Sequence, residues 1–141
     1  MTARQNCRSA PRAKVSPMAK IKDIVFDCES APQLARFWAS ALDDYEIRPY
    51  DEAEIQRLAA LGLTPETDPT VMVDGPNGSL GFQQVPEGKV AKNRVHVDLI
   101  SEDRRRDAEQ LVALGASVHA EYHDHTVMAD PEGNEFCLYN P

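Results

Sequence analysis

The sequence predicts an α+β fold in which one module, a strand followed by a helix and three more strands, occurs twice. The opening strands of both modules alternate apolar and polar side chains, as strands buried on one face do. Each opening strand is followed by a capped segment with apolar residues at helical spacing. The length of 141 residues suits a single domain with one core. We expect one domain over residues 18–141, with modules at about residues 20–86 and 93–141.

The first module opens with a strand over residues 21–28, and Cys28 on its apolar side is expected to be an inert buried thiol. Ser30 is predicted to cap the following helix, with Gln33 at the capping-box position. The apolar stripe of this helix includes Trp38, which we expect in the core and not in a binding site.

The rest of the first module contains one helix more than the second. A short strand is predicted near residues 45–49, and Asp51 is predicted to cap an additional helix that ends at Gly62. Two strands, at residues 70–73 and 79–85, are separated by a turn rich in glycine, proline and asparagine.

The second module begins again with a strand, at residues 94–100. Ser101 is predicted to cap its helix, and Gly115 to end it. The apolar stripe of this helix is Ala108, Leu111 and Val112. Three short strands follow, at about residues 117–122, 125–129 and 135–139.

The charge is distributed unevenly along the chain. Residues 1–17 contain four basic and no acidic side chains, and we expect a disordered basic tail there. The formal net charge is −8, and without the tail 11 basic side chains face 23 acidic ones, a net charge of −12. Such a domain is expected to repel nucleic acid and anionic membranes, and to favour neutral or cationic small molecules.

Three cysteines without close spacing indicate neither a disulfide framework nor a zinc knuckle. We therefore expect a reducing, cytoplasmic compartment.

Several motifs resemble the vicinal-oxygen-chelate superfamily, in particular its glyoxalase-like and bleomycin-resistance-like members. The motifs are the closing run at residues 130–136 (DPEGNEF) and the segments at residues 26–28, 34–38, 82–85 and 93–98. The resemblance implies two βαβββ modules that form a curved mixed sheet around a cavity, commonly in a homodimer. Members of the superfamily include lyases, dioxygenases, isomerases, thiol transferases and non-catalytic proteins that sequester antibiotics, so the fold does not fix the function.

Polar side chains opposite the apolar faces of the strands are expected to line that cavity. His96 is the candidate catalytic acid or base, with Asp98 or Asp23 as the partner that orients it. The candidate ligand-binding residues are Asp23, Asp27, Gln83, Arg94, Glu135, Cys137 and Tyr139. Arg94 or Gln83 would stabilise a developing oxyanion.

A divalent metal is possible, but no cofactor is favoured. By resemblance to the metal-using members, the four ligand positions fall on Asp23, Gln83, His96 and Cys137. A glutamine is a weak ligand and an unusual member of a zinc site, so the set favours a metal-free pocket.

Three other candidates are weaker. His123 and His125 flank an aspartate at a predicted turn and are expected to be solvated. The run at residues 104–106 (RRR) is expected to form a solvated helix face. Cys137 is weighed as a nucleophile activated by His96, but a buried spectator is favoured.

Three functions follow from these observations, and whether the protein is an enzyme stays open. The first is a protein that binds a small molecule without a metal. The second is a lyase- or isomerase-type enzyme that transfers protons through His96. The third is a metal-dependent enzyme of the glyoxalase or dioxygenase kind, which the ligand set disfavours.

Overall fold

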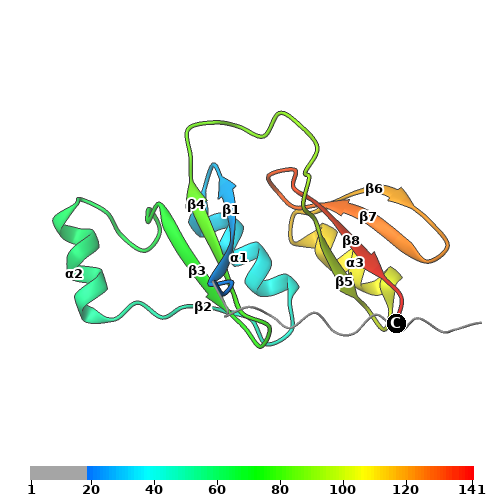
Figure 1. Ribbon diagram of the computed structural model, residues 1–141, viewed down its shortest axis with the longest axis horizontal. Coiled ribbons are helices and arrows are strands. Elements are labelled where there is room, and N and C mark those ends of the chain that lie inside the picture. Colours follow the sequence, from blue (N-terminus) through cyan, green and yellow to red (C-terminus); the bar gives the residue numbers. More distant parts are fainter. Residues whose placement is uncertain (1–18) are drawn as a thin grey trace, which may run out of the picture.

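The computed structural model describes residues 19–141, so the predicted tail at residues 1–17 lies outside the described residues. Figure 1 shows two four-stranded sheets beside each other, joined by a long connection. The strands are β1 (Asp23–Cys28), β2 (Glu46–Ile47), β3 (Thr70–Asp74), β4 (Ser79–Gln84), β5 (Val97–Ile100), β6 (Ser117–Glu121), β7 (His125–Ala129) and β8 (Glu135–Tyr139). The helices are α1 (Ala31–Ala41), α2 (Glu52–Ala60) and α3 (Arg104–Ala113).

The two sheets repeat one topology. Their strand orders are β1-β4-β3-β2 and β5-β8-β7-β6, and in each sheet the first two strands of that order run parallel while the other neighbours run antiparallel. Both sheets are therefore mixed, and the predicted α+β fold is confirmed. Within residues 19–141, the outer edges of β1 and β5 pair with no strand, so the sheets do not close.

The core joins the two modules through a cluster of aromatic rings. Trp38 on α1 is 1% exposed, and its ring centroid lies 5.4 Å from that of Phe26, 5.4 Å from that of Phe37 and 5.2 Å from that of Phe136. Because Phe136 belongs to β8, α1 packs against both modules. The predicted burial of Trp38 and Cys28 is confirmed, and burial raises the pKa of the Cys28 thiol to about 12, so this thiol stays protonated and inert.

The turn between β7 and β8, residues 130–134, forms a second contact between the modules, here called the joint. The carboxylate of Asp130, which is 3% exposed, accepts a hydrogen bond of 3.1 Å from the indole N–H of Trp38. It also accepts bonds from the backbone N–H groups of Glu132 and Asn134, at 3.0 and 2.9 Å, and from the side-chain amide of Asn134. One buried carboxylate thus accepts the hydrogen bonds of the turn and also binds the turn to α1.

The same turn supplies the cap of α1. Ser30 is the N-cap residue, as predicted, but its side chain makes no cap hydrogen bond, and the expected capping box with Gln33 is wrong. The carboxylate of Glu132 instead accepts hydrogen bonds from the backbone N–H groups of Glu29 and Ser30. Glu132 therefore holds the N-cap residue and the residue before it, and places a negative charge near the N-terminus of α1, where the helix dipole favours one.

The additional helix α2 forms as predicted and projects away from both sheets (Figure 1). The Asp51 side chain accepts a hydrogen bond of 2.8 Å from the backbone N–H of Glu54. Leu58 is fully buried, and Gly62 ends the helix with a φ of +73°, a conformation that favours glycine.

The start of α3 corrects a prediction. Its cap is Asp103, whose side chain accepts from the backbone N–H of Arg106 at 3.1 Å, and not Ser101. Ser101 follows the end of β5 and is held beside β8, because its backbone N–H donates to the carbonyl of Tyr139 at 2.9 Å. Its hydroxyl donates to Asp107 at 2.6 Å instead of capping the helix.

The opening strand of the second module is also shorter than predicted. It begins at Val97, so Arg94 and His96 precede the strand and do not lie within it. The backbone N–H of Asn93 donates to the Glu135 carboxylate at 3.0 Å. The segment before Val97 is therefore held by a side chain, and not by the backbone hydrogen bonds of a strand pair.

Candidate functional site

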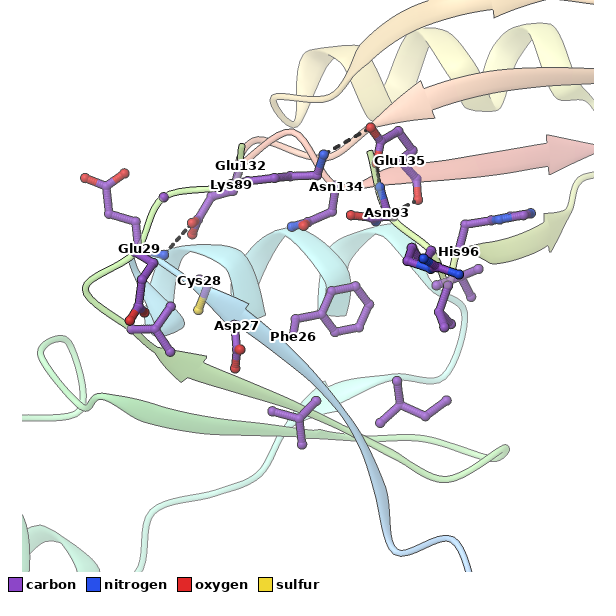
Figure 2. A pocket seen from close by; sticks show the side chains of 18 of the residues that line it. Phe26, Asp27, Cys28, Glu29, Lys89, Asn93, His96, Glu132, Asn134 and Glu135 are labelled. Carbon is purple, nitrogen blue, oxygen red and sulfur yellow. Dashed lines mark hydrogen bonds and ion pairs between the residues drawn. The ribbon is translucent and has the colours of Figure 1, made fainter. Parts of the chain in front are cut away.

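A cavity of about 1030 Å³, here called the central cleft, lies between β1 and the connection that leads into β5. The turn at residues 131–135 forms its far wall, and Figure 2 shows the polar side chains that converge there. Sites for small molecules commonly have volumes of about 300–1,000 Å³, so the cleft is large enough for one.

Four of the predicted site residues line the central cleft, and five do not. Those that line it are Asp27, Arg94, His96 and Glu135. Those outside its lining are Asp23, Gln83, Asp98, Cys137 and Tyr139.

Strand register shows that predicted residues inside and outside the cleft lining share the same faces of the sheets. Asp27 lies opposite Gln83 across β1 and β4, and the alternate position Phe82 is buried on the helix side. In the second sheet Asp98 lies opposite Cys137, with buried Leu138 next along the strand. The polar positions therefore share the faces of the two sheets that the helices leave open, as the alternation predicts.

His96 meets Asp98 on the open face of the second sheet. The His96 Nε2 and Asp98 Oδ1 atoms are 3.2 Å apart, and both side chains are about half exposed. Cys137 joins them, since one possible ligand atom from each of the three residues lies within 4.8 Å of the others. Burial, together with the charge of Asp98, raises the pKa of the Cys137 thiol, which disfavours the thiolate and hence a nucleophilic role.

The four-residue metal set implied by the resemblance does not fit this arrangement. Asp23 pairs instead with Lys22 at 3.4 Å. Among residues 19–141, the cluster of three or more histidine, cysteine or acidic side chains close enough to share an ion is His96, Asp98 and Cys137, without Asp23. Those three groups are acceptable zinc donors, but the metal would have to displace the proton of a thiol whose pKa is raised.

Glu135 holds the connection between the modules. Its carboxylate accepts hydrogen bonds of 3.0 Å from Lys89 Nζ and 3.0 Å from the backbone N–H of Asn93. Burial acts to raise the pKa of Glu135, but these bonds outweigh it and lower the pKa to about 2. Glu135 is therefore engaged within the protein and less free to bind a ligand.

This lowered pKa predicts a loss of stability in acid. A carboxylate whose pKa falls from 4.5 when unfolded to about 2 when folded stabilises the protein above about pH 4.5, and the contribution disappears as the pH falls through about 2. We expect Glu135→Gln to cost about 2 kcal/mol at neutral pH, with allowance for solvent screening, and almost nothing at about pH 2. Urea unfolding at both pH values measures this, and the exposed Glu66→Gln serves as the control. An equal cost at both pH values would contradict it.

The end of β1, the connection and the turn contribute cleft residues that the sequence did not single out. These are Glu29, Glu87, Lys89, Asn93, Glu132 and Asn134. Asn93, Glu132 and Asn134 lie in motif segments at residues 93–98 and 130–136, but those motifs point to a fold and not to a lining. The connection carries no periodic pattern, so its position could not be predicted.

Unpaired charge in the central cleft is mainly negative. Asp27, Glu29 and Glu87 line it, and none of the three forms an ion pair among the described residues. Lys89 is engaged by Glu135, which leaves Arg94 as the unpaired cation of the lining.

The predicted solvated turn is correct for His123 and wrong for His125. The side chain of His123 is 95% exposed, whereas that of His125 is 22% exposed. The His125 ring is stacked between Tyr122 and Tyr139, with centroid distances of 4.6 and 4.9 Å. Because His125 is the first residue of β7 and not part of the turn, its side chain lies among cross-strand neighbours.

A family model described as a glyoxalase-like domain matches residues 23–139. The solved structure of the fosfomycin resistance protein FosX from Mesorhizobium loti is similar, with a TM-score of 0.62 and 12% identity over 87% of this chain and 92% of that one. A glyoxalase/bleomycin resistance protein/dioxygenase family enzyme from Burkholderia phytofirmans PsJN gives a TM-score of 0.61 and 11% identity, over 86% of this chain and 98% of that one. The oxidase ChaP-H2 gives a TM-score of 0.52 and 15% identity, over 89% of this chain and 95% of that one.

No curated protein matches the sequence. At such low identities the solved structures establish the fold and leave the activity open. Together with the family match over nearly the whole described chain, they show that the chain belongs to the glyoxalase-like domains of the vicinal-oxygen-chelate superfamily.

Proposed function

We propose that the protein binds a small neutral or cationic organic molecule in the central cleft, without the four-ligand metal centre implied by the resemblance. The observation that carries the proposal is the excess of unpaired carboxylates, Asp27, Glu29 and Glu87, around a cavity of suitable size. A partly enclosed acidic site attracts cations, because the field is less screened there than at an open surface.

A thermal-shift comparison of choline, agmatine and pyruvate tests this proposal. We expect the two cations to raise the melting temperature and pyruvate to leave it unchanged. The double variant Asp27→Asn/Glu87→Gln should lose the response to the cations, whereas Glu66→Gln, which lies outside the cleft lining, should keep it. Stabilisation by pyruvate but by neither cation would contradict the proposal.

A second candidate, proton transfer by His96, is favoured by the 3.2 Å distance between His96 and Asp98. A carboxylate that accepts from Nε2–H would leave Nδ1 with the lone pair of a general base. Deuterium exchange at the methyl groups of acetone, a neutral ketone, in heavy water tests this chemistry. We expect the protein to accelerate the exchange, His96→Ala to abolish the acceleration, and Asp98→Asn to reduce it. Equal exchange rates with and without the protein would contradict this candidate.

The absence of a resident metal is a separate prediction. Protein purified without chelator is expected to contain far less than one equivalent of zinc, nickel, iron or manganese, because Asp23 does not join His96 and Cys137, and a glutamine is a weak ligand. Elemental analysis measures this. One equivalent of any of these metals that is lost in His96→Ala would show that the histidine belongs to a metal centre.

A homodimer is also proposed, on the evidence of exposed apolar side chains along the two unpaired strand edges. Ile24 and Val25 on β1 are each 53% exposed, Val95 before β5 is 81% exposed, and Ile100 on β5 is 75% exposed. The first three also line the central cleft, so a partner subunit would border the ligand site. Unpaired edges with apolar side chains favour association, and sedimentation velocity would detect it.

The described helices include none that is long and apolar enough to span a bilayer. Cys28 and Cys137 are free thiols, which supports the proposed reducing, cytoplasmic compartment.

A further inference from the structure

A second cavity, of about 580 Å³, lies on the opposite side of the second sheet from His96. It is a groove between α3 and β6, the outermost strand of that sheet, and it is remote from the first module (Figure 1). Ala108 and the buried Thr126 lie deepest in its lining. Val112 and Val118 line its two walls.

The walls of this groove leave apolar surface uncovered. Val112 is 46% exposed, Val118 is 43% exposed and Tyr122 is 53% exposed. Val112 belongs to the apolar stripe of α3, which was predicted to be buried against the sheet, and its exposure corrects that prediction. Val112 lines the groove between α3 and β6, and neither element covers it there. Exposed apolar groups that converge in a concave site are typical of ligand pockets.

Arg104 lies at one end of the groove with an unsatisfied donor. Its Nη2 donates to the His123 carbonyl at 3.3 Å, which pins the side chain across the groove end. Its Nη1 is buried and has no hydrogen-bond partner. The predicted solvated face at residues 104–106 is therefore wrong at its first residue.

The two arginines that follow on α3 are paired, unlike Arg104. Arg105 pairs with Glu109 at 3.3 Å, and Arg106 pairs with Asp107 at 2.8 Å. Within residues 19–141, Arg104 has no carboxylate within ion-pair distance, although acidic side chains outnumber basic ones. A buried guanidinium N–H without an acceptor is costly. Because Nη1 has almost no exposed surface, an anionic ligand group would remove that cost by drawing the guanidinium into the groove.

We propose that the groove is a second binding site, for an amphipathic monocarboxylate. The carboxylate would accept from Arg104, and the apolar chain would run along α3 between Val112 and Val118. From Arg104 to Val112 the helix rises about 12 Å, which suits a chain of medium length. Glu121 also lines the groove and disfavours a second negative charge on the ligand.

Octanoate is the probe, with 1-octanol as the uncharged compound of the same chain length. We expect calorimetry to show octanoate binding to the wild-type protein, at least about tenfold more weakly to Arg104→Gln, and unchanged to Arg106→Gln. The Arg106 variant is the matched control, since that side chain lies outside the groove lining, is 59% exposed and pairs with Asp107. Octanol should bind wild type and Arg104→Gln equally. Val118→Glu, which places a negative charge in the wall, should abolish octanoate binding.

Amide chemical shifts locate the probe independently of any variant. Octanoate should perturb residues of α3 and β6, and its affinity should be unchanged in His96→Ala, which separates this site from the central cleft. Three results would overturn the proposal: no binding of octanoate, equal loss in the Arg104 and Arg106 variants, or shifts confined to the central cleft. Neither success nor failure here bears on the cations proposed for the cleft.

Discussion

Replacing Asp130 with alanine is expected to lower the free energy of unfolding by about 3–5 kcal/mol, because it removes the acceptor of several donors at once. The indole N–H of Trp38, the backbone N–H groups of Glu132 and Asn134, and the Asn134 amide all donate to this one carboxylate. Asp130 is 3% exposed, so water cannot replace the lost acceptor without opening the joint between the modules. Urea unfolding followed by tryptophan fluorescence measures the change.

Glu132→Gln is the matched control for this turn, since it keeps an acceptor at the start of α1 and leaves Asp130 in place. It should cost less than about 1 kcal/mol, as expected for the loss of one charged acceptor near solvent. If Asp130→Ala costs no more than this control, the turn does not join the modules.

Replacing Trp38 with alanine is expected to cost about 3–5 kcal/mol, the usual range for removing a large aromatic side chain from a core. Trp38 is 1% exposed and contacts rings from both modules, among them Phe26 of the first and Phe136 of the second. The cavity left behind would lie between the modules, where neither sheet can move to fill it without breaking the joint at Asp130. Guanidinium unfolding measures this loss, and the circular dichroism of the folded variant shows whether the secondary structure is kept.

Trp38→Phe tests the contribution of the hydrogen bond separately from that of aromatic packing. It keeps most of the aromatic contact and removes the donor to Asp130. We expect it to cost about 1–2 kcal/mol, and to show coupling with Asp130→Ala in a double-mutant cycle. Additive effects of the two substitutions would mean that the indole N–H contributes nothing to the joint.

The fold could be predicted from the sequence because its periodic patterns are local. Alternation in the two opening strands places Cys28 on the helix side and Asp27 on the open side, and the structure agrees. Two predictions failed where a distant partner decides. The backbone N–H of Ser101 donates to the carbonyl of Tyr139 on β8, and Ser101 does not cap α3. At the start of α1, the backbone N–H of Ser30 donates to Glu132 from the other module.

The candidate site could be predicted in part. The alternation correctly indicates that Asp98 and Cys137 share an open face, and His96 lines the cleft instead of packing under a helix. The sequence could not show that Glu135 is held by Lys89, because the connection that carries this lysine has no regular structure. Nor could it show the exposure of Val112, which depends on how closely α3 approaches β6.

The central claim is that the cleft beside His96 is an open ligand site, distinct from the buried joint between the modules. An NMR titration of the ¹⁵N-labelled protein with agmatine tests it most directly. We predict progressive amide shifts in residues 24–29 and 87–97, with the shifts weakened in Asp27→Asn/Glu87→Gln. Saturation of the protein with agmatine while these segments stay unperturbed would contradict the claim.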